Sequence, residues 1–305
     1  MGNIKNEFSW SISRDRDFQL CNRKYFLSRY AFWGGWEQSA DEITRKIYTL
    51  KNQISIPMLV GKAVHKTIER TLNSLKSRKL SLDEAKRLAI GLFKKGWRES
   101  RNEEWKSDPK RKINLFEHYY EEVPAEQELK EVGAIINTNV ENFFSSDSFK
   151  FIQSIKPLNW LSIELMESFK INGETVWCVI DFALKDNGRV FIYDWKTGKK
   201  ITEDERQLAV YSLYAMNKWA VDLQDIRLFD VYLRINTPVK VKVSSSLIDE
   251  TLLYINQSAN EMKSLLDNVE KNTASIQNFP KIDNINICLR CSFKEICYPE
   301  GLKQQ

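Results

Sequence analysis

The sequence predicts an α/β protein whose mixed central β-sheet is flanked by helices. Apolar residues recur at helical spacing through most of the first half of the chain. After Pro157, three segments rich in β-branched and aromatic residues are separated by hairpin turn signals. From Glu203 onward, helical and strand-like segments alternate. Short strands gathered between helices are typical of an α/β core.

The first half of the chain is predicted to be largely helical. Ser13 to Tyr30 is expected to form one short basic helix, which ends before the pair Gly34-Gly35. Ser81 and Glu84 match a capping box, which marks the start of a later helix. The same periodicity predicts two further helices, over Val60–Leu75 and Ala125–Phe144.

The second half is predicted to carry the sheet. Asn172-Gly173 and Asp186-Asn187-Gly188 are hairpin turn signals. The strands they separate are Leu161–Ile171, Thr175–Leu184 and Arg189–Trp195. The remaining predicted elements are a helix at Glu203–Trp219, strands at Ile226–Ile235 and Val239–Val243, and a helix at Leu247–Val269. No Pro- or Gly-rich linker interrupts them, so we expect one domain over residues 1–305. It would contain a helical insertion at about 80–150 and a cysteine-bearing segment at about 280–300.

Composition is that of a folded, soluble chain. Of the 305 residues, 42% are hydrophobic and 29% are charged, which favours a packed core over disorder. No apolar run reaches the roughly 18–20 residues that a membrane span requires. The first residues, Met1–Lys5, lack the apolar stretch of a signal peptide. We therefore expect a cytoplasmic protein that does not bind membranes.

Positive charge is concentrated in one segment, although the net charge is only +5. Between Lys62 and Lys112 there are 16 Lys and Arg residues against 7 Asp and Glu, together with Trp97 and Trp105. A basic surface with aromatic side chains suits a polyanion with stackable bases. The structural alternative is a solvated helix face.

Two acidic residues and a lysine lie on neighbouring predicted strands. Asp181 belongs to one strand of a hairpin and Asp194 to the next, so their carboxylates can converge on a divalent cation. Lys196 shares the face of Asp194 and could orient water or stabilise charge during phosphodiester hydrolysis. Taken singly, such residues are more often turn residues and solvated charges, and His65 alone is more often an ordinary helix histidine. The combination is much less expected by chance.

Four of the five cysteines indicate a second kind of metal site. They are Cys21, Cys288, Cys291 and Cys297. A large chain without an export signal seldom relies on disulfides, and thiolates select softer metals than carboxylates do. Tetrahedral zinc also takes four cysteines, although zinc sites more often use two Cys-x2-Cys pairs. The fifth, Cys178, lies in a predicted strand as a buried thiol.

These residues fall in motifs that together resemble the PD-(D/E)XK nuclease superfamily. The branch resembled is that of the RecB and AddB nuclease domains and the CRISPR-associated iron–sulfur exonucleases. The motifs, in the family's order, are Ser11–Tyr30, Gly61-x3-His65, Val179–Asp181, Tyr193–Gly198, Gln207–Tyr211 and Cys288-x2-Cys291-x5-Cys297. The resemblance spans about Ser11 to Pro299 and implies a restriction-endonuclease-like core.

The resemblance implies a role for each matching residue. The implied ligands of Mg²⁺ or Mn²⁺ are His65, Asp181, Asp194 and the backbone carbonyl of Trp195. The implied catalytic residues are His65, Asp181, Asp194, Lys196, Gln207 and Tyr211, the last two supporting the lysine and contacting DNA. Cys21, Cys288, Cys291 and Cys297 would bind a [4Fe–4S] cluster that joins the two ends of the chain.

Two positions leave questions open. A glycine often stands three places before the motif aspartate in this family, whereas this chain has Cys178 there. The family's acidic residue on the preceding strand corresponds to Glu164 or Glu167, and both alternatives stay open.

The resemblance implies a metal-dependent deoxyribonuclease that acts as an exonuclease on single-stranded DNA ends. Its setting would be DNA end-processing, repair or CRISPR spacer acquisition. No helicase P-loop is present, so unwinding would require a helicase partner, and CRISPR adaptation proteins are the other expected partners. Two alternatives stay open: a non-catalytic iron–sulfur DNA-binding subunit of a helicase–nuclease complex, and a zinc-stapled adaptor.

Overall fold

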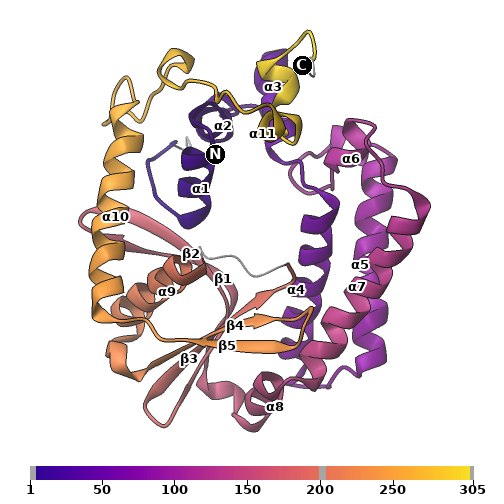
Figure 1. Cartoon of the computed structure of the whole chain (residues 1–305), viewed down its shortest axis with the longest axis vertical. Coiled ribbons are helices and arrows are strands. Elements are labelled where there is room, and N and C mark those ends of the chain that lie inside the picture. The colour runs from indigo at the N-terminus through magenta and orange to yellow at the C-terminus, as the bar shows by residue number, and fades with distance from the viewer. Residues whose placement is uncertain (1–4, 199–203, 303–305) are drawn as a thin grey trace.

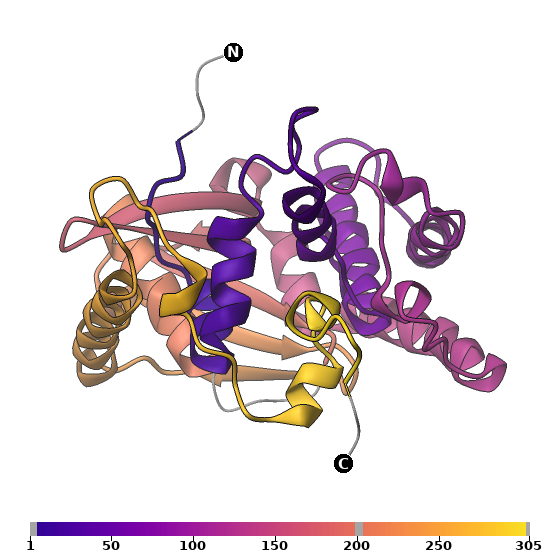
Figure 2. The same ribbon diagram turned by 90° about the horizontal axis from the view of Figure 1, so that it is seen from above.

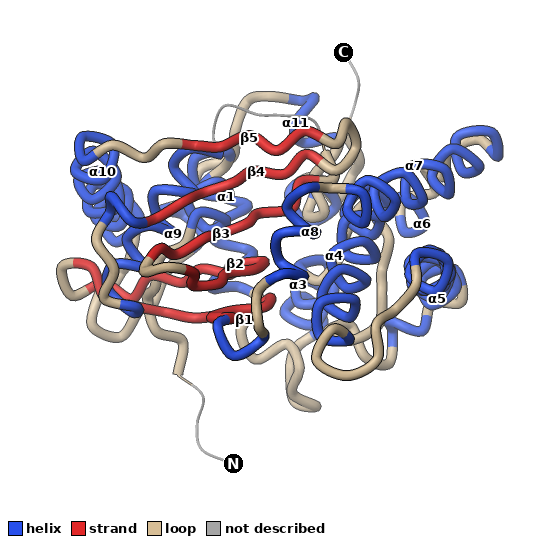
Figure 3. The backbone as a smooth tube through the Cα atoms, turned by 90° about the horizontal axis from the view of Figure 1, so that it is seen from below, coloured by secondary structure: helices blue, strands red, loops and turns tan. Residues whose placement is uncertain are grey.

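A five-stranded mixed sheet forms the centre of the structure, a computed structural model that describes residues 5–198 and 204–302. Its strands are β1 (Trp160–Ile171), β2 (Glu174–Asp186), β3 (Arg189–Lys196), β4 (Ile226–Tyr232) and β5 (Thr237–Val241). They lie side by side in chain order (Figure 3). β3 and β4 pair in parallel, and the other neighbours are antiparallel. This sheet and its surrounding helices confirm the predicted α/β class.

Two tight turns set the register of the first three strands. Asn172 and Gly173 have φ values of 48° and 87°, and Asn187 and Gly188 have 46° and 79°. Two successive left-handed residues are the geometry of a type I′ hairpin turn, which glycine and asparagine tolerate best. Both predicted hairpins are therefore confirmed.

Helices cover both faces of the sheet (Figure 1). One core joins the sheet to α1 (Ile12–Leu20), α9 (Asp204–Trp219) and α10 (Ser245–Ser264). The other core joins it to α4 (Ile56–Ser74), α5 (Leu82–Arg101), α7 (Glu126–Ser145) and α8 (Asp147–Ser154). Ser81 and Glu84 do form the predicted capping box at the start of α5. The sheet is thus the middle layer between two helical layers.

The N-terminal segment differs from its prediction. Ser13–Tyr30 is not one helix, because the backbone is extended at Cys21 (φ −167°, ψ 116°). α1 ends before this residue, and α2 (Asn22–Phe26) and the short π-helix η1 (Leu27–Ala31) follow it. Arg23 hydrogen bonds to the far end of the chain, through its N–H to the Pro280 carbonyl at 3.1 Å and its Nε to the Phe279 carbonyl at 2.7 Å. Local periodicity does not register such distant contacts, so the single-helix prediction was wrong.

The C-terminal segment lies beside the N-terminal helices (Figure 2). It contains α11 (Ile285–Leu289) and α12 (Lys294–Cys297), and it contacts α3 (Glu42–Lys51) and α6 (Phe116–Tyr119). Glu295 pairs with Lys46 at 2.9 Å and accepts a hydrogen bond from the Tyr119 hydroxyl at 2.5 Å. The two ends of the chain are therefore held together by polar contacts of the protein itself.

Short 3₁₀ turns complete the fold. They are η2 (Glu104–Lys106), η3 (Pro157–Asn159), η4 (Leu223–Asp225) and η5 (Ile276–Asn278). Across residues 5–198 and 204–302, no helix combines the length and the apolar character that crossing a membrane would need.

Candidate functional site at a fork in the sheet

β2 and β3 separate at the point where Asp181 and Asp194 lie. The antiparallel ladder between these strands runs from Asp186–Arg189 to Phe182–Tyr193. Asp181 and Asp194 come next in the same register, and beyond them β2 continues along β1 and β3 along β4. The Trp195 N–H points into this fork and donates to Asp181 Oδ2 at 2.7 Å.

β1 is distorted opposite Asp181. Ile163 pairs with Phe182 and Leu165 with Ile180, so Glu164 is the residue that faces Asp181. Glu164 has a φ of 50°, a left-handed conformation that is unusual within a strand. Such a conformation costs on the order of 1–3 kcal/mol for a residue other than glycine, and this kind of strain clusters at functional sites. We attribute it here to the turn that brings the Glu164 carboxylate to His65.

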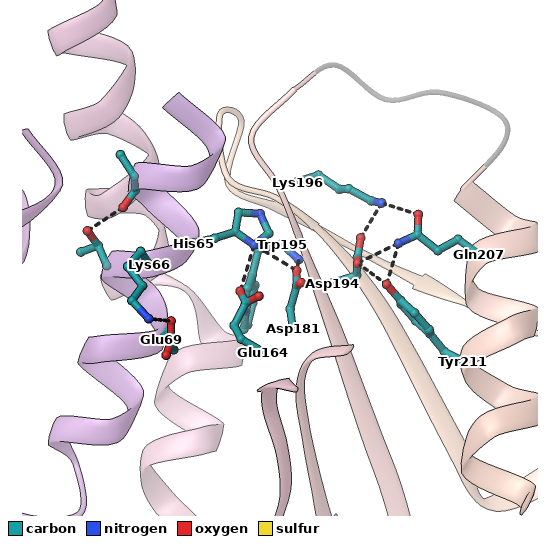
Figure 4. A network of polar contacts seen from close by, with 12 residues as sticks. His65, Lys66, Glu69, Glu164, Asp181, Asp194, Trp195, Lys196, Gln207 and Tyr211 are labelled. Carbon is teal, nitrogen blue, oxygen red and sulfur yellow. Dashed lines mark hydrogen bonds and ion pairs between the residues drawn. The ribbon is translucent and has the colours of Figure 1, made fainter. Parts of the chain in front are cut away.

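His65, Glu164 and Asp181 form a compact group of potential metal ligands (Figure 4). His65 Nδ1 lies 3.0 Å from Glu164 Oε1 and 3.6 Å from Asp181 Oδ2. One ligand atom from each of the three residues lies within 4.8 Å of the others. Helix α4 supplies the histidine from across the fork. Two carboxylates beside one imidazole suit a small divalent cation.

The charges of this group are strongly coupled. Burial opposes the charged form of His65, but Asp181 and then Glu164 outweigh it and raise the pKa of His65 well above its usual range. Burial also disfavours the Asp181 carboxylate, and the charges of Asp194 and Glu164 add to this effect. Although the charge of His65 acts in the opposite direction, the pKa of Asp181 is raised to about 6. The group therefore combines concentrated negative charge with a protonated imidazole. Because a metal ion binds the neutral imidazole, it would displace that proton.

Asp194 belongs to an adjoining network. Its Oδ2 lies 2.5 Å from Lys196 Nζ, and its Oδ1 accepts hydrogen bonds from the Tyr211 hydroxyl at 3.1 Å and Gln207 Nε2 at 3.3 Å. Gln207 closes the network, because its Oε1 accepts from Lys196 Nζ at 3.3 Å and its Nε2 donates to the Tyr211 hydroxyl at 2.6 Å. The Lys196 side chain is 19% exposed and that of Asp194 is 5% exposed. The lysine is therefore the member of this pair that reaches solvent.

The structure brings all the predicted inner-site residues to the fork, in two groups. His65 and Asp181 gather with Glu164, whereas Asp194 contacts Lys196, Gln207 and Tyr211. The Trp195 side chain is buried in the core, and its backbone N–H holds Asp181. The metal-binding roles of Asp194 and of the Trp195 carbonyl stay predictions.

Of the two acidic residues left open on β1, Glu164 lies in the site and Glu167 does not. Glu167 Oε2 is 3.8 Å from Lys218 Nζ, and Glu167 pairs with Cys178 across the hairpin. The sequence contained a signal that could have decided this. A two-residue turn at Asn172-Gly173 places Glu164, and not Glu167, opposite Asp181.

A cavity of mixed charge adjoins the ligand group on the side of α4 and α5. It has a volume of about 390 Å³ and includes His65 and Glu164 in its lining. Its basic lining residues are Lys62, Lys66, Lys95 and Arg111, and its acidic lining residues besides Glu164 are Glu69 and Glu99, which pair with Lys66 at 2.6 Å and Lys95 at 3.8 Å. The basic residues belong to the segment that the sequence analysis singled out for its positive charge. The two tryptophans of that segment do not add stacking surfaces here, because Trp105 is buried and Trp97 packs against His118 at 4.4 Å between ring centroids.

The four cysteines of the predicted outer site line one cavity of about 1050 Å³. Cys21 reaches it from the break between α1 and α2, and Cys288, Cys291 and Cys297 reach it from the C-terminal segment. Among the described residues, which include all four, no three of the sulfur atoms lie within 4.8 Å of one another. One zinc ion with Zn–S bonds of about 2.3 Å would hold its sulfurs about 3.8 Å apart. The sulfurs are thus too widely spaced for one zinc ion in this arrangement.

Burial affects the outer cysteines as well. It raises the pKa of Cys291, and with the charge of Cys291 it raises the pKa of Cys297 to about 11. These thiols are therefore protonated near neutral pH, and metal loading would release their protons. The predicted iron–sulfur cluster itself stays a prediction.

Comparison with protein families gives a match over most of the chain. A family model described as the PD-(D/E)XK nuclease superfamily matches residues 9–298. The match covers nearly the whole chain, including the fork and all four cysteines of the outer cavity. No curated protein matches the chain.

Proposed function

The chain belongs to the PD-(D/E)XK nuclease superfamily, and we propose that it is a Mg²⁺- or Mn²⁺-dependent deoxyribonuclease. The observation that carries this proposal is the fork. There, His65, Glu164 and Asp181 offer ligand atoms within 4.8 Å of one another, beside a lysine that reaches solvent. The donor chemistry suits a hard divalent cation, which this family's reaction requires.

The ligand group would bind the cation jointly with Asp194. His65, Glu164 and Asp181 would bind it through one imidazole nitrogen and two carboxylate oxygens, and Asp194 and the Trp195 carbonyl are the further ligands proposed. When bound, the cation would supply Lewis-acid stabilisation of the charge on the scissile phosphate. Negative charge from Asp181, Asp194 and Glu164 raises the pKa of buried groups in this region, and a cation would offset that charge.

Lys196 would act on the attacking water or on the charged phosphate oxygens. Asp194 and Gln207 contact its Nζ at 2.5 and 3.3 Å, which restricts where the ammonium can lie. Tyr211 in turn contacts both Asp194 and Gln207. A charge held in place before the reaction stabilises the transition state more than a mobile one, because no reorganisation is needed. Gln207 and Tyr211 would therefore position Lys196, and they are also proposed to contact the substrate.

The substrate proposed is single-stranded DNA, degraded from an end. Four cations, Lys62, Lys66, Lys95 and Arg111, line the cavity beside His65 and Glu164 and support a polyanion, although Glu69 and Glu99 pair with two of them. The exonuclease action, and roles in DNA end-processing, repair or CRISPR spacer acquisition, rest on the resemblance to the RecB, AddB and CRISPR-associated branch. A helicase or CRISPR adaptation proteins are the partners that this resemblance proposes.

The outer cysteines are proposed to bind a [4Fe–4S] cluster. All four cysteines line one cavity, and among the described residues no three of their sulfurs lie within 4.8 Å of one another, as they would around one zinc ion. A cluster binds its four thiolates on separate irons and so tolerates a wider spacing. Its binding energy would add to the polar contacts that already join the two ends of the chain.

The nuclease proposal is tested by the Lys196→Ala variant on end-labelled single- and double-stranded DNA, with Mg²⁺, Mn²⁺ or EDTA. Loss of one preorganised charge is expected to slow cleavage by about 100-fold or more while leaving DNA binding nearly unchanged. The matched control is Lys185→Ala, which removes an exposed lysine from the neighbouring strand β2. The ladder of labelled products reports the polarity of degradation.

Three results would contradict these proposals. Full activity of Lys196→Ala would exclude the proposed role of the lysine. Tight DNA binding by the wild type without cleavage under any metal condition would instead support the non-catalytic subunit. Zinc rather than iron in the purified protein would favour the stapled adaptor.

A further inference from the structure

A second cavity begins at the catalytic fork and extends away from the ligand group. It has a volume of about 770 Å³ and is lined by Gln207 and Tyr211 at the fork and by residues of α1 and the β1–β2 hairpin. A smaller cavity of about 140 Å³ adjoins it and shares Arg14, Arg29 and Trp33 with it. Lys51 lines only the smaller cavity of the two. A continuous lined space thus joins the fork to a group of three cations.

The three cations have little negative charge beside them. Arg14 Nη1 donates to the Ser9 carbonyl at 2.6 Å and to the Ser9 hydroxyl, which are neutral groups. Lys51 Nζ lies 3.0 Å from the centroid of the Phe32 ring. Arg29 lies 3.7 Å from Asp17, which Lys24 contacts more closely at 2.8 Å. Within the described part of the chain, no carboxylate comes within 4.0 Å of the Arg14 or Lys51 cation.

The cations oppose one another electrostatically. Burial, followed by the charge of Arg29, lowers the pKa of Arg14 to about 10. Burial, followed by the charges of Arg29 and Arg14, lowers the pKa of Lys51 to about 7. The pKa of Arg29 is lowered as well, chiefly by burial. Partly buried like charges with one carboxylate at 3.7 Å between the three of them are unfavourable, and a phosphate group placed among them would relieve the repulsion.

We propose that Arg14, Arg29 and Lys51 bind a phosphate of the nucleic-acid strand whose phosphodiester bonds are cut at the fork. This inference rests on the proposed nuclease function. It assigns the strand a second point of attachment, across the cavity from Gln207 and Tyr211. The strand would then be held on both sides of the reacting phosphate, by the cavity at Lys62 and Lys66 and by this cluster.

The lining of the larger cavity favours a nucleic-acid strand over a small anion. Trp33 and Trp177 line it together with the arginines, and aromatic rings beside cations accommodate stacked bases. The acidic residue in the lining of both cavities, Glu7, is exposed. The volume of the larger cavity also lies within the range of about 300–1,000 Å³ that is usual for ligand sites.

The test measures binding without cleavage. Isothermal titration calorimetry in EDTA would compare the wild-type protein with Arg29→Met and Lys51→Met. The ligands are hexathymidylate with a 5′-phosphate, with a 5′-hydroxyl or with a 3′-phosphate, and inorganic phosphate alone. Both variants are expected to bind the oligonucleotides about tenfold more weakly or worse. The matched control is Lys240→Met, which removes one exposed charge from β5, and it is expected to change affinity less than about twofold.

Each outcome bears on the proposal. A preference for one phosphorylated end that disappears in the variants would identify a terminal phosphate as the ligand. Equal affinity for the three oligonucleotides, lowered in both variants, would identify an internal phosphate. Unchanged oligonucleotide affinity in both variants overturns the proposal, as does an effect confined to inorganic phosphate.

The readout also separates this inference from the nuclease proposal. Weaker binding by the variants together with an inactive wild type would retain the phosphate site and reject the enzyme. Normal cleavage by the wild type, with oligonucleotide binding unaffected in the variants, would retain the enzyme and reject the phosphate site. Lys51→Met is expected to fold, because it removes a buried charge without leaving an unpaired acid.

Discussion

Glu164 shows at the scale of one residue how the fork is assembled. Its left-handed backbone interrupts β1 opposite Asp181, and its carboxylate contacts His65 at 3.0 Å. Three residues along the same strand, Glu167 has regular pairing and lies 3.8 Å from Lys218. The two glutamates therefore form a natural pair for comparison.

Glu164→Gln is expected to weaken metal-dependent cleavage, because an amide replaces one carboxylate of the ligand group. The metal concentration needed for half-maximal cleavage should rise by at least about tenfold, the size of effect typical of partners at a metal site. Glu167→Gln should remain within about twofold of the wild type. Equal effects of the two substitutions would show that Glu164 has no special role.

The lowered pKa of Lys51 predicts that the stability of the protein depends on pH. Its pKa is lowered from 10.5 to about 7, by burial and then by Arg29 and Arg14. Above about pH 7 the Lys51 side chain is deprotonated in the folded protein, whereas in the unfolded chain it stays protonated up to about pH 10.5. Its contribution to the free energy of unfolding therefore rises with pH in this range. Lys51→Met removes that dependence. The variant should be more stable than the wild type at about pH 6, and its advantage should shrink toward about pH 9.5.

Denaturant unfolding at a series of pH values measures this difference. An advantage of the variant that stayed constant with pH would show that Lys51 keeps an ordinary pKa. Added inorganic phosphate should also stabilise the wild type more than the variant if the anion binds at the cation cluster.

At the scale of elements, a buried polar network joins α1 to α10. Asp15, which is 4% exposed, accepts hydrogen bonds from the Tyr254 hydroxyl at 2.8 Å and the Ser258 hydroxyl at 2.6 Å. Ser258 in turn accepts from Trp10 Nε1 at 3.0 Å. This network holds the helix that leads to Cys21 and to the cation cluster against the helical layer of the sheet.

Asp15→Ala is expected to lower the free energy of unfolding by about 2–4 kcal/mol, because the buried Ser258 hydroxyl and the half-buried Tyr254 hydroxyl would lose their acceptor. The control is Asp249→Ala, which removes an exposed carboxylate from α10 and should change stability by less than about 0.5 kcal/mol. Chemical denaturation of both variants measures the difference. A similar small change in both would mean that the network contributes little.

At the scale of the whole molecule, the two ends of the chain lie against each other. Arg23 hydrogen bonds to the Phe279 and Pro280 carbonyls, and Cys21 shares a cavity with the three C-terminal cysteines. A loop of this length costs only a few kcal/mol of chain entropy to close, since that cost grows logarithmically with length. Protein contacts together with a bound cluster could therefore hold the closure.

Cys291→Ala is expected to lower iron and acid-labile sulfide content and to give a colourless, less stable protein. Cys178→Ala is the matched control, because Cys178 lies on β2 and not in the cysteine cavity. It should keep its iron. Metal analysis and visible absorbance of anaerobically prepared protein measure both. A brown and stable Cys291→Ala protein would contradict the proposed cluster.

The sequence by itself determined the fold class, both hairpins, the capping box of α5 and the residues that gather at the fork. These features depend on periodicity, turn chemistry and motif order, which are encoded within a few neighbouring residues. Even the choice of Glu164 over Glu167 was contained in the Asn172-Gly173 turn, because a two-residue hairpin determines every pair along its strands.

Only the tertiary structure decided the break at Cys21, the division of the fork into two networks and the grouping of Arg14 with Arg29 and Lys51. Each depends on contacts between residues far apart in sequence, such as Arg23 with Phe279. Helical spacing in Ser13–Tyr30 is a local property, and it does not reveal that a distant carbonyl hydrogen bonds to one of these residues. Asp194 and Lys196 share a face of β3 by their spacing, but Gln207 and Tyr211 reach them only because α9 packs at this point, and that packing is a property of the folded chain.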